Sequence, residues 1–192
     1  MDSLSVLAMA AAAAPRSQAQ PATDFTIRKA RNEDIPLLGP VERSAAEIFR
    51  SVNLDFLSDG PTMDESLLSK MTNSNHLWVA VNKSDQPIGF AGGEDIDGNF
   101  HVAEVSVTQH AQGKGVGKSL MTELIRQAKE EGYTTITLTT YRDLPWNGPW
   151  YNKLGFLEVK VNEMGREYSK MLDSEAHHGH DMNLRCIMRK IL

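Results

Sequence analysis

Three strand-like runs that follow one another almost without interruption place the strongest constraint on how this chain folds. They are HLWVAV (residues 76–81), PIGFAGGED (87–95) and FHVAEVSVT (100–108), and the polar turns NKSDQ and DIDGN join them. Runs rich in β-branched and aromatic residues, bounded by such turns, are typical of neighbouring strands in an antiparallel sheet. The sequence therefore predicts an antiparallel meander at the centre of the fold.

Two helices are predicted before the meander. DFTIRKA alternates apolar and polar residues, as a half-buried strand does, and a helix is expected to follow it over residues 32–50. The pair Gly39-Pro40 is expected to kink or split this helix. SVNLDFLSDGP (51–61) is predicted to be a loop, and residues 64–71 a short second helix.

A glycine-rich loop follows the meander and leads into a helix over residues 115–131, which has one apolar face and ends at Gly132. Further on, TTITLTT predicts a strand, WNGPWYNKLGF a short helix, FLEVKV a strand and NLRCIMRKIL the last strand, with a charged helical segment before it. This order predicts one mixed α/β domain over residues 23–192. Its sheet is expected to be mostly antiparallel, with about six to seven strands flanked by helices.

The first residues differ in composition from the rest. MDSLSVLAMAAAAAP begins with Asp2 where a signal peptide carries a cationic segment, and its first arginine, Arg16, follows the apolar run. The run is also too short to span a bilayer. We expect residues 1–22 to form a disordered Ala-rich extension, with a cleaved targeting peptide as the alternative.

Composition excludes several classes of function. The net charge of -5 argues against a nucleic-acid-binding protein, which usually carries a basic excess. Cys186 is the only cysteine, so neither an intrachain disulfide nor a cysteine-based zinc site can form. We expect a cytoplasmic protein, monomeric or homodimeric, with neither a nucleic acid nor a membrane as its partner.

The glycine-rich loop QGKGVGKS (residues 112–119) invites a nucleotide-binding interpretation that its spacing does not support. A P-loop needs a glycine five positions before its GK pair, and that position is Gln112. A dinucleotide-binding fingerprint needs G-x-G-x-x-G after the first strand of a βαβ unit, whereas this loop has G-x-G-x-G after a meander. A glycine-rich turn that only caps a helix remains an alternative.

QGKGVG (residues 112–117) resembles the Q/R-x-x-G-x-G/A signature of the GNAT family of N-acetyltransferases. EVSV (104–107) is similar to the end of the family's fourth strand, and YNKLGF (151–156) to its Y-x-x-x-G-F signature. The resemblance covers residues 24–192. It implies a GNAT fold in which the fourth and fifth strands splay apart to admit acetyl-CoA, acetyl-CoA as co-substrate, and no metal.

The pyrophosphate of coenzyme A suits the physics of the loop. Glycines let the backbone approach an anion, the unpaired N–H groups of the helix's first turn point at it, and two lysines add positive charge. By resemblance, amides of the fourth strand hold the thioester. The family's asparagine lies about two helical turns before the tyrosine, whereas Asn147 is four positions ahead, so its pantetheine contact is left open. The expected cofactor-binding residues are Val105, Ser106, Val107, Gln112, Gly113, Lys114, Gly115, Val116, Gly117, Lys118, Ser119 and Asn147.

Two side chains are predicted to be catalytic. Tyr151 lies where the family's tyrosine lies, and a phenol with a pKa near 10 can protonate the leaving thiolate. Glu104 is the leading candidate for the base, since strict alternation puts it with Ser106 on the strand face opposite Ala103, Val105 and Val107. It could instead bind the ammonium or form a structural ion pair. Asp143 and His101 are reserve candidates for the base.

The acceptor is expected to be the primary amine of a small molecule, such as a polyamine, amino acid, arylalkylamine or amine toxin. A protein lysine or N-terminus, or a non-catalytic acetyl-CoA-binding role, are the alternatives. Residues 51–61 and the segment before the last strand are expected to border the acceptor site. His177, His178 and His180 are predicted to lie in a solvated loop without a metal. The aromatic residues that either wall the acceptor pocket or belong to the core are Trp146, Trp150, Phe49 and Phe56.

Overall fold

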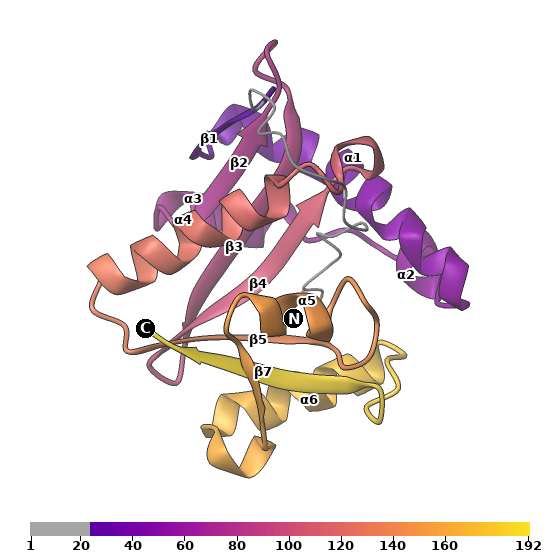
Figure 1. Cartoon of the computed structure of the whole chain (residues 1–192), viewed down its shortest axis with the longest axis vertical. Coiled ribbons are helices and arrows are strands. Elements are labelled where there is room, and N and C mark those ends of the chain that lie inside the picture. Colours follow the sequence, from indigo (N-terminus) through magenta and orange to yellow (C-terminus); the bar gives the residue numbers. More distant parts are fainter. Residues whose placement is uncertain (1–23) are drawn as a thin grey trace.

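The computed structural model describes residues 24–192, so the predicted extension over residues 1–22 lies outside the described residues. Within the described part, the chain forms a seven-stranded sheet in the order β1-β2-β3-β4-β5-β7-β6 (Figure 1). All neighbouring strands are antiparallel except β4 and β5, which confirms the predicted mixed, mostly antiparallel sheet. The strands are β1 (Thr26–Lys29), β2 (Leu77–Val81), β3 (Pro87–Ile96), β4 (Asn99–Val107), β5 (Thr135–Tyr141), β6 (Leu157–Val159) and β7 (Arg185–Ile191).

Helices cover both faces of this sheet. Figure 1 shows α4 and α5 in front of it and α3 and α6 behind it. The α-helices are α1 (Ile35–Ala46), α2 (Asp55–Asp59), α3 (Glu65–Asn73), α4 (Val116–Glu130), α5 (Gly148–Lys153) and α6 (Arg166–His177). Short 3-10 helices are η1 (Asn32–Asp34), η2 (Glu47–Val52), η3 (Gln109–Ala111) and η4 (Val161–Glu163).

The segment before the meander departs from the prediction in two ways. First, α1 continues through Pro40 and changes to 3-10 geometry only at Glu47. Second, the predicted loop 51–61 contains the helix α2. Tertiary contacts stabilise α2, because the Ser58 hydroxyl donates to the carbonyl of Ala46 at 2.7 Å and neighbouring apolar side chains pack on α1 and η2. Contacts distant in sequence override a local loop signal in this way.

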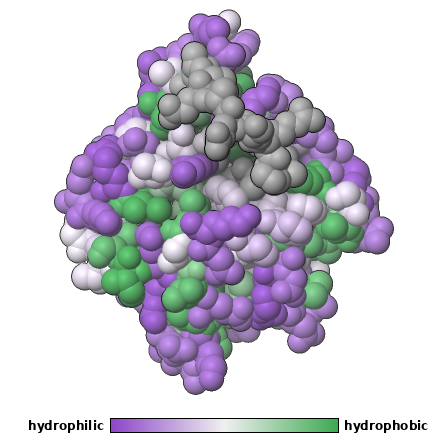
Figure 2. Space-filling view, in the orientation of Figure 1, coloured by the Kyte–Doolittle hydropathy of each residue, from purple (hydrophilic) through white to green (hydrophobic). Residues whose placement is uncertain are grey.

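Each face of the sheet has its own apolar core. Val102, Val105 and Val107 of β4 pack with the apolar side of α4, while Ala103 packs with side chains of α1 and α3 on the opposite face. The exterior face in Figure 2 is mostly hydrophilic, with hydrophobic side chains in separate patches. Among the described residues, no helix is both long and apolar enough to cross a membrane.

β4 and β5 form the opening that the sequence analysis expected. They pair only where Phe100 meets Ile136 and His101 meets Thr137. Beyond these two positions β4 stays paired with β3, and β5 stays paired with β7 up to Tyr141. The two strands therefore diverge into a V, which is visible in Figure 1, and the predicted splay is confirmed.

Candidate active site

A β-bulge lies at the point where β4 leaves β5. Gly92 of β3 is opposite Glu104, but the next residue, Gly93, is opposite Val102, so Ala103 is the extra residue in β4. The predicted strict alternation is therefore wrong for Ala103, which packs on the face opposite Val105. A bulge causes this exchange, because one inserted residue reverses the faces of the side chains beyond it.

The bulge and the splay leave a backbone amide of β4 available to a ligand. The Thr108 N–H donates to the carbonyl of Ile88, so alternation directs the Ser106 N–H to β3 as well. The amides of Val105 and Val107 point the other way, toward the side from which β5 has diverged, but the Val105 N–H acts there as a donor to the Glu104 carboxyl and lowers its pKa, so the amide that stays available is that of Val107. The Gln112 side chain donates to the Val107 carbonyl at 3.0 Å and leaves the amide untouched.

Glu104 is fully buried beside this opening. The Ser106 hydroxyl donates to its Oε1 at 2.8 Å, whereas Oε2 has no hydrogen-bond partner among the described residues. Burial raises the pKa of the carboxyl well above its usual range, and the charge of Glu42 raises it further. A carboxyl whose pKa is raised in this way can accept a proton near neutral pH.

Tyr151 of α5 is the second buried group with an unsatisfied polar atom. Its phenol oxygen has no partner among the described residues, and only 1% of the residue is exposed. Burial raises its pKa above the usual value, and the negative charge of Glu104 raises it further. Tyr151 packs in the core on the α4 face, whereas Glu104 lies opposite Gly92 on the face of Met71 and Leu77, so the two predicted catalytic side chains lie on opposite faces of the sheet.

The glycine loop ends in the N-terminus of α4. Gly113 and Gly115 have φ angles of 72° and 87°, and Gly115 is the N-cap residue. The Ser119 N–H makes the first bond back to the Gly115 carbonyl, so the amides of the three residues between them face outward without acceptors inside the helix. The exposed lysines of the loop, Lys114 and Lys118, add positive charge at this end.

Substitution of Gly115 tests whether these amides bind the pyrophosphate. A Cβ at this position would meet no atom within 4 Å, so Gly115→Ala adds backbone strain and no clash. An L-residue in the left-handed region costs about 1–2 kcal/mol, which favours other loop conformations that turn the amides away. We expect the Kd for acetyl-CoA to rise about tenfold, measured by isothermal titration calorimetry.

Gly98 provides a matched control for this substitution. It lies in the turn between β3 and β4, has a φ of 76°, and also has open space around the position of a Cβ. Gly98→Ala therefore introduces similar strain far from the loop, and we expect its affinity for acetyl-CoA to remain that of the wild type. Equal losses in both variants would show that the effect reflects general destabilisation.

Asn147 has a clear position in the fold. Its side chain is buried and donates to the Thr140 hydroxyl at 2.9 Å, while its carbonyl accepts the N–H groups of Trp150 and Tyr151 at the start of α5. Next to it, a Cβ on Gly148 would lie 2.2 Å from the Arg142 carbonyl oxygen, so only glycine fits there. These contacts fix the position of Tyr151; a contact of Asn147 with the pantetheine arm stays a prediction.

On the other side of the splay, aromatic side chains form a wall. Phe49 packs against Trp146 and Tyr141 with ring centroids 6.2 and 5.9 Å apart. The ring of Phe56 meets His180 at 5.4 Å, so α2 touches the segment before β7. Residues 51–61, which contain α2, and the segment before β7 are the two predicted borders of the acceptor site. Trp150 lies apart from them, with its ring 4.8 Å from that of Tyr151.

The histidines and the reserve bases take different places. His177 and His178 are exposed, but His180 is buried with its Nδ1 2.9 Å from the Tyr141 hydroxyl, so the predicted solvated loop is wrong for His180. No group of three potential metal ligands occurs in the described part of the chain. His101 is buried, and desolvation lowers its pKa to about 3, whereas Asp143 is exposed.

Glu42 is the buried polar residue of this region that the sequence analysis did not single out. It lies on the buried face of α1, four residues after Leu38 and three before Ala45, and is 4% exposed. A carboxylate at a position that helical periodicity assigns to the apolar face is a detectable signal. Its Oε2 accepts the Met63 N–H at 2.8 Å, and burial raises its pKa to about 7.

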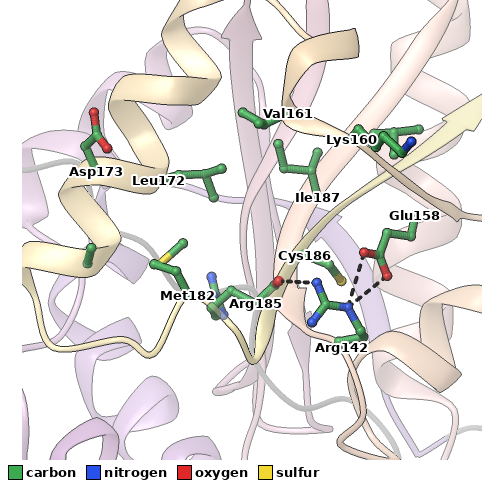
Figure 3. Close-up of a pocket in the computed structure, with 12 residues that line it drawn as sticks. Arg142, Glu158, Lys160, Val161, Leu172, Asp173, Met182, Arg185, Cys186 and Ile187 are labelled. Carbon is green, nitrogen blue, oxygen red and sulfur yellow. Dashed lines mark hydrogen bonds and ion pairs between the residues drawn. The ribbon is translucent and has the colours of Figure 1, made fainter.

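A separate cavity of about 470 Å³ lies between β6, β7 and α6 (Figure 3). None of the predicted catalytic or cofactor-binding residues lines it. Its two arginines are already engaged, because Arg142 pairs with Glu158 and donates to the Arg185 carbonyl, while Arg185 pairs with Glu175. The cavity is therefore distinct from the splay that holds Glu104 and Tyr151.

Known proteins resemble this chain over most of its length. The model of the family described as Acetyltransferase (GNAT) family matches residues 45–156. Peptidyl-lysine N-acetyltransferase YjaB from Escherichia coli is 30% identical over 152 residues, which cover 75% of this chain and 92% of that protein.

Solved structures share the fold at lower identity. The PaiA N-acetyltransferase from Thermoplasma acidophilum, in complex with coenzyme A, has a TM-score of 0.64 and 18% identity, and the match covers 88% of this chain and 99% of that one. N-acetylglutamate synthase from Neisseria gonorrhoeae, complexed with coenzyme A and N-acetyl-glutamate, has a TM-score of 0.65 and 17% identity. There the match covers 88% of this chain and 35% of the longer one.

Proposed function

The chain belongs to the GNAT family of acetyltransferases, and we propose that it transfers the acetyl group of acetyl-CoA to the primary amine of a small molecule. N-acetyl transfer with acetyl-CoA as co-substrate is the activity of the family. The described residues fit this co-substrate, since a glycine loop with open space and outward amides lies near two buried, unpartnered polar atoms. Bound acetyl-CoA supplies a thioester whose carbonyl carbon accepts the amine.

In this proposal, each group of residues has one task. The loop over residues 112–119 holds the pyrophosphate through its amides and lysines. The amide of Val107 donates a hydrogen bond to the thioester carbonyl oxygen as negative charge develops on it. Glu104 takes a proton from the acceptor's ammonium, and Tyr151 gives its proton to the departing thiolate.

The effect of the Glu104 charge on Tyr151 gives these two proton transfers an order. While Glu104 is ionised, its charge raises the pKa of the Tyr151 phenol and holds the proton there. When Glu104 takes up the proton of the ammonium, this charge disappears and the phenol becomes a stronger acid. Tyr151 is thereby activated at the stage when the sulfur needs a proton.

The contact between Phe56 and His180 is the observation that favours a small acceptor. An extended peptide would lie between α2 and the segment before β7, but these two borders meet with ring centroids 5.4 Å apart. His180 is held in this position by its hydrogen bond to Tyr141. A slender alkylamine needs no groove of this kind, because only its chain has to reach Glu104.

Peptidyl-lysine acetylation is the second candidate. The relative that is 30% identical carries the name peptidyl-lysine N-acetyltransferase. A lysine side chain is itself an alkylamine, so it presents the same ammonium to the same carboxyl. The two candidates differ in what surrounds the amine, which makes them separable by experiment.

An acceptor screen tests the proposal. Release of thiol from acetyl-CoA is measured with polyamines, free amino acids, arylalkylamines and lysine-containing peptides. We expect the highest kcat/KM with a small free amine. Higher kcat/KM for the peptides would establish the second candidate, and absence of turnover with every amine would reject acetyl transfer to amines.

A further inference from the structure

Glu42 and Glu104 form a pair of buried carboxyls that come from different elements. Glu42 lies on the buried face of α1, which packs on β3 and β4. Glu104 is opposite Gly92, whose Cβ position faces Met71 and Leu77, so its side chain lies on the sheet face that α1 and α3 cover. The charge of Glu42 acts on Glu104 across this packing. α1 is fixed over the end of β4, since the Ser44 hydroxyl accepts the Gln109 N–H at 3.1 Å. The pair is thus built into the packing of helix on sheet.

Neither carboxyl of the pair has a cationic partner among the described residues. Arg43, next to Glu42, is exposed and donates to the Gly60 carbonyl at 3.5 Å. Arg185, the cationic side chain that acts on Glu104, is fully engaged in its bidentate pair with Glu175 at 2.8 and 2.9 Å. Buried carboxyls are rare unless they are paired, so a cation from outside the chain would supply the partner that both groups lack.

Acceptor atoms remain available on both carboxyls. Oε2 of Glu104 has no hydrogen bond among the described residues, and only Oε2 of Glu42 accepts one. Glu42 also borders a small hollow between α1 and the segment after it, together with Ala46, Leu57 and Ser58. Glu42 is therefore the member of the pair that faces the predicted acceptor border formed by residues 51–61.

We propose that Glu42 and Glu104 together bind the ammonium group of the acceptor, and that Glu42 selects cationic alkylamines over neutral analogues. This inference rests on the proposed function and adds a second carboxyl to it. The pair holds one shared proton when the ammonium binds, so the site becomes neutral. The ammonium then gives one proton to the pair, which leaves two carboxylic acids and a neutral amine whose lone pair forms the new C–N bond.

The titration of the two groups agrees with this assignment. Burial raises the pKa of Glu42 to about 7, and burial together with the charge of Glu42 raises that of Glu104. Below about pH 7 Glu42 is therefore protonated, and an ammonium has to displace this proton. Affinity for a cationic amine should rise about tenfold for each pH unit up to about pH 7 and level off above it.

Glu42→Gln tests the inference without removing the contact to Met63, because the glutamine oxygen can accept the same N–H. The probes are pentylamine, which mimics a lysine side chain as well as a free alkylamine, and the neutral 1-pentanol. Each is titrated by calorimetry into the enzyme saturated with coenzyme A. We expect wild type to bind pentylamine at least tenfold more tightly than 1-pentanol, and Glu42→Gln to lose this preference.

Two comparisons make the result decisive. Glu47→Gln, which removes an exposed carboxyl paired with Arg50 on the next turn, should retain the preference. Should Glu42→Gln fail to fold, the pH dependence of pentylamine binding to wild type between pH 5 and 8 replaces it. Equal affinities for pentylamine in Glu42→Gln and wild type, or pentylamine affinity independent of pH, would overturn the inference. The acceptor screen tests the proposed function separately, because it measures turnover by the wild-type enzyme alone.

Discussion

Tyr151→Phe is expected to lower kcat about a hundredfold or more while the Kd for acetyl-CoA stays within about threefold of the wild-type value. The variant removes one oxygen that has no hydrogen-bond partner among the described residues. It should therefore fold as well as the wild type, and removing the buried unsatisfied group should stabilise it slightly. Stopped-flow thiol release and calorimetric titration with acetyl-CoA measure the two quantities.

Tyr168 offers a matched control for this variant. It is also a fully buried tyrosine, but it belongs to α6 and its hydroxyl is 2.6 Å from the Thr137 hydroxyl of β5. Tyr168→Phe should lose about 1 kcal/mol of stability and retain most of kcat. If Tyr151→Phe turned over as fast as Tyr168→Phe, Tyr151 would have no role as the acid.

The features of the site that could be predicted from the sequence are local in the chain. The loop over residues 112–117 needs glycines because Gly113 and Gly115 take positive φ angles within a few residues of a helix start. The order of strands and helices likewise follows from short periodic patterns and turns. Tyr151 was assigned by resemblance, and its unpartnered hydroxyl agrees with the predicted role without testing it.

The features that escaped prediction depend on contacts between distant segments. The bulge at Ala103 exists only in the register of β4 against β3, and no pattern within FHVAEVSVT marks it. Glu42 becomes a partner of Glu104 because α1 crosses β4, some sixty residues later in the chain. In the sequence His180 belongs to a run of histidines that is expected to be exposed. In the structure it is enclosed by Tyr141 and Phe56.

The two faces of the sheet divide the proposed reaction between them. Tyr151 and the glycine loop lie with α4 and α5, while Glu42, Phe56 and His180 lie with α1, α2 and the segment before β7. The V between β4 and β5 lies between these two sides. In the proposed reaction the thioester therefore approaches from one face of the sheet and the amine from the other.

The bidentate pair of Arg185 and Glu175 holds the acceptor side in place, and breaking it is expected to have the largest effect on stability. Arg185 lies on β7 and Glu175 on α6; both are buried, and the Thr139 hydroxyl completes the network. Glu175→Ala leaves the guanidinium buried without its counter-ion. We expect a loss of about 3–5 kcal/mol in the free energy of unfolding, measured by urea denaturation.

A double variant distinguishes the cost of an unpaired charge from the value of the pair. Arg185→Met combined with Glu175→Leu removes both charges and keeps similar volume, so it should recover most of the stability lost in Glu175→Ala. Glu130→Ala, which breaks an exposed pair with Arg126 on α4, should cost no more than about 0.5 kcal/mol. A double variant less stable than Glu175→Ala would show instead that the ion pair itself stabilises α6 against β7. Because α6 leads directly to His180, loss of the pair should also raise KM for the amine more than Kd for acetyl-CoA.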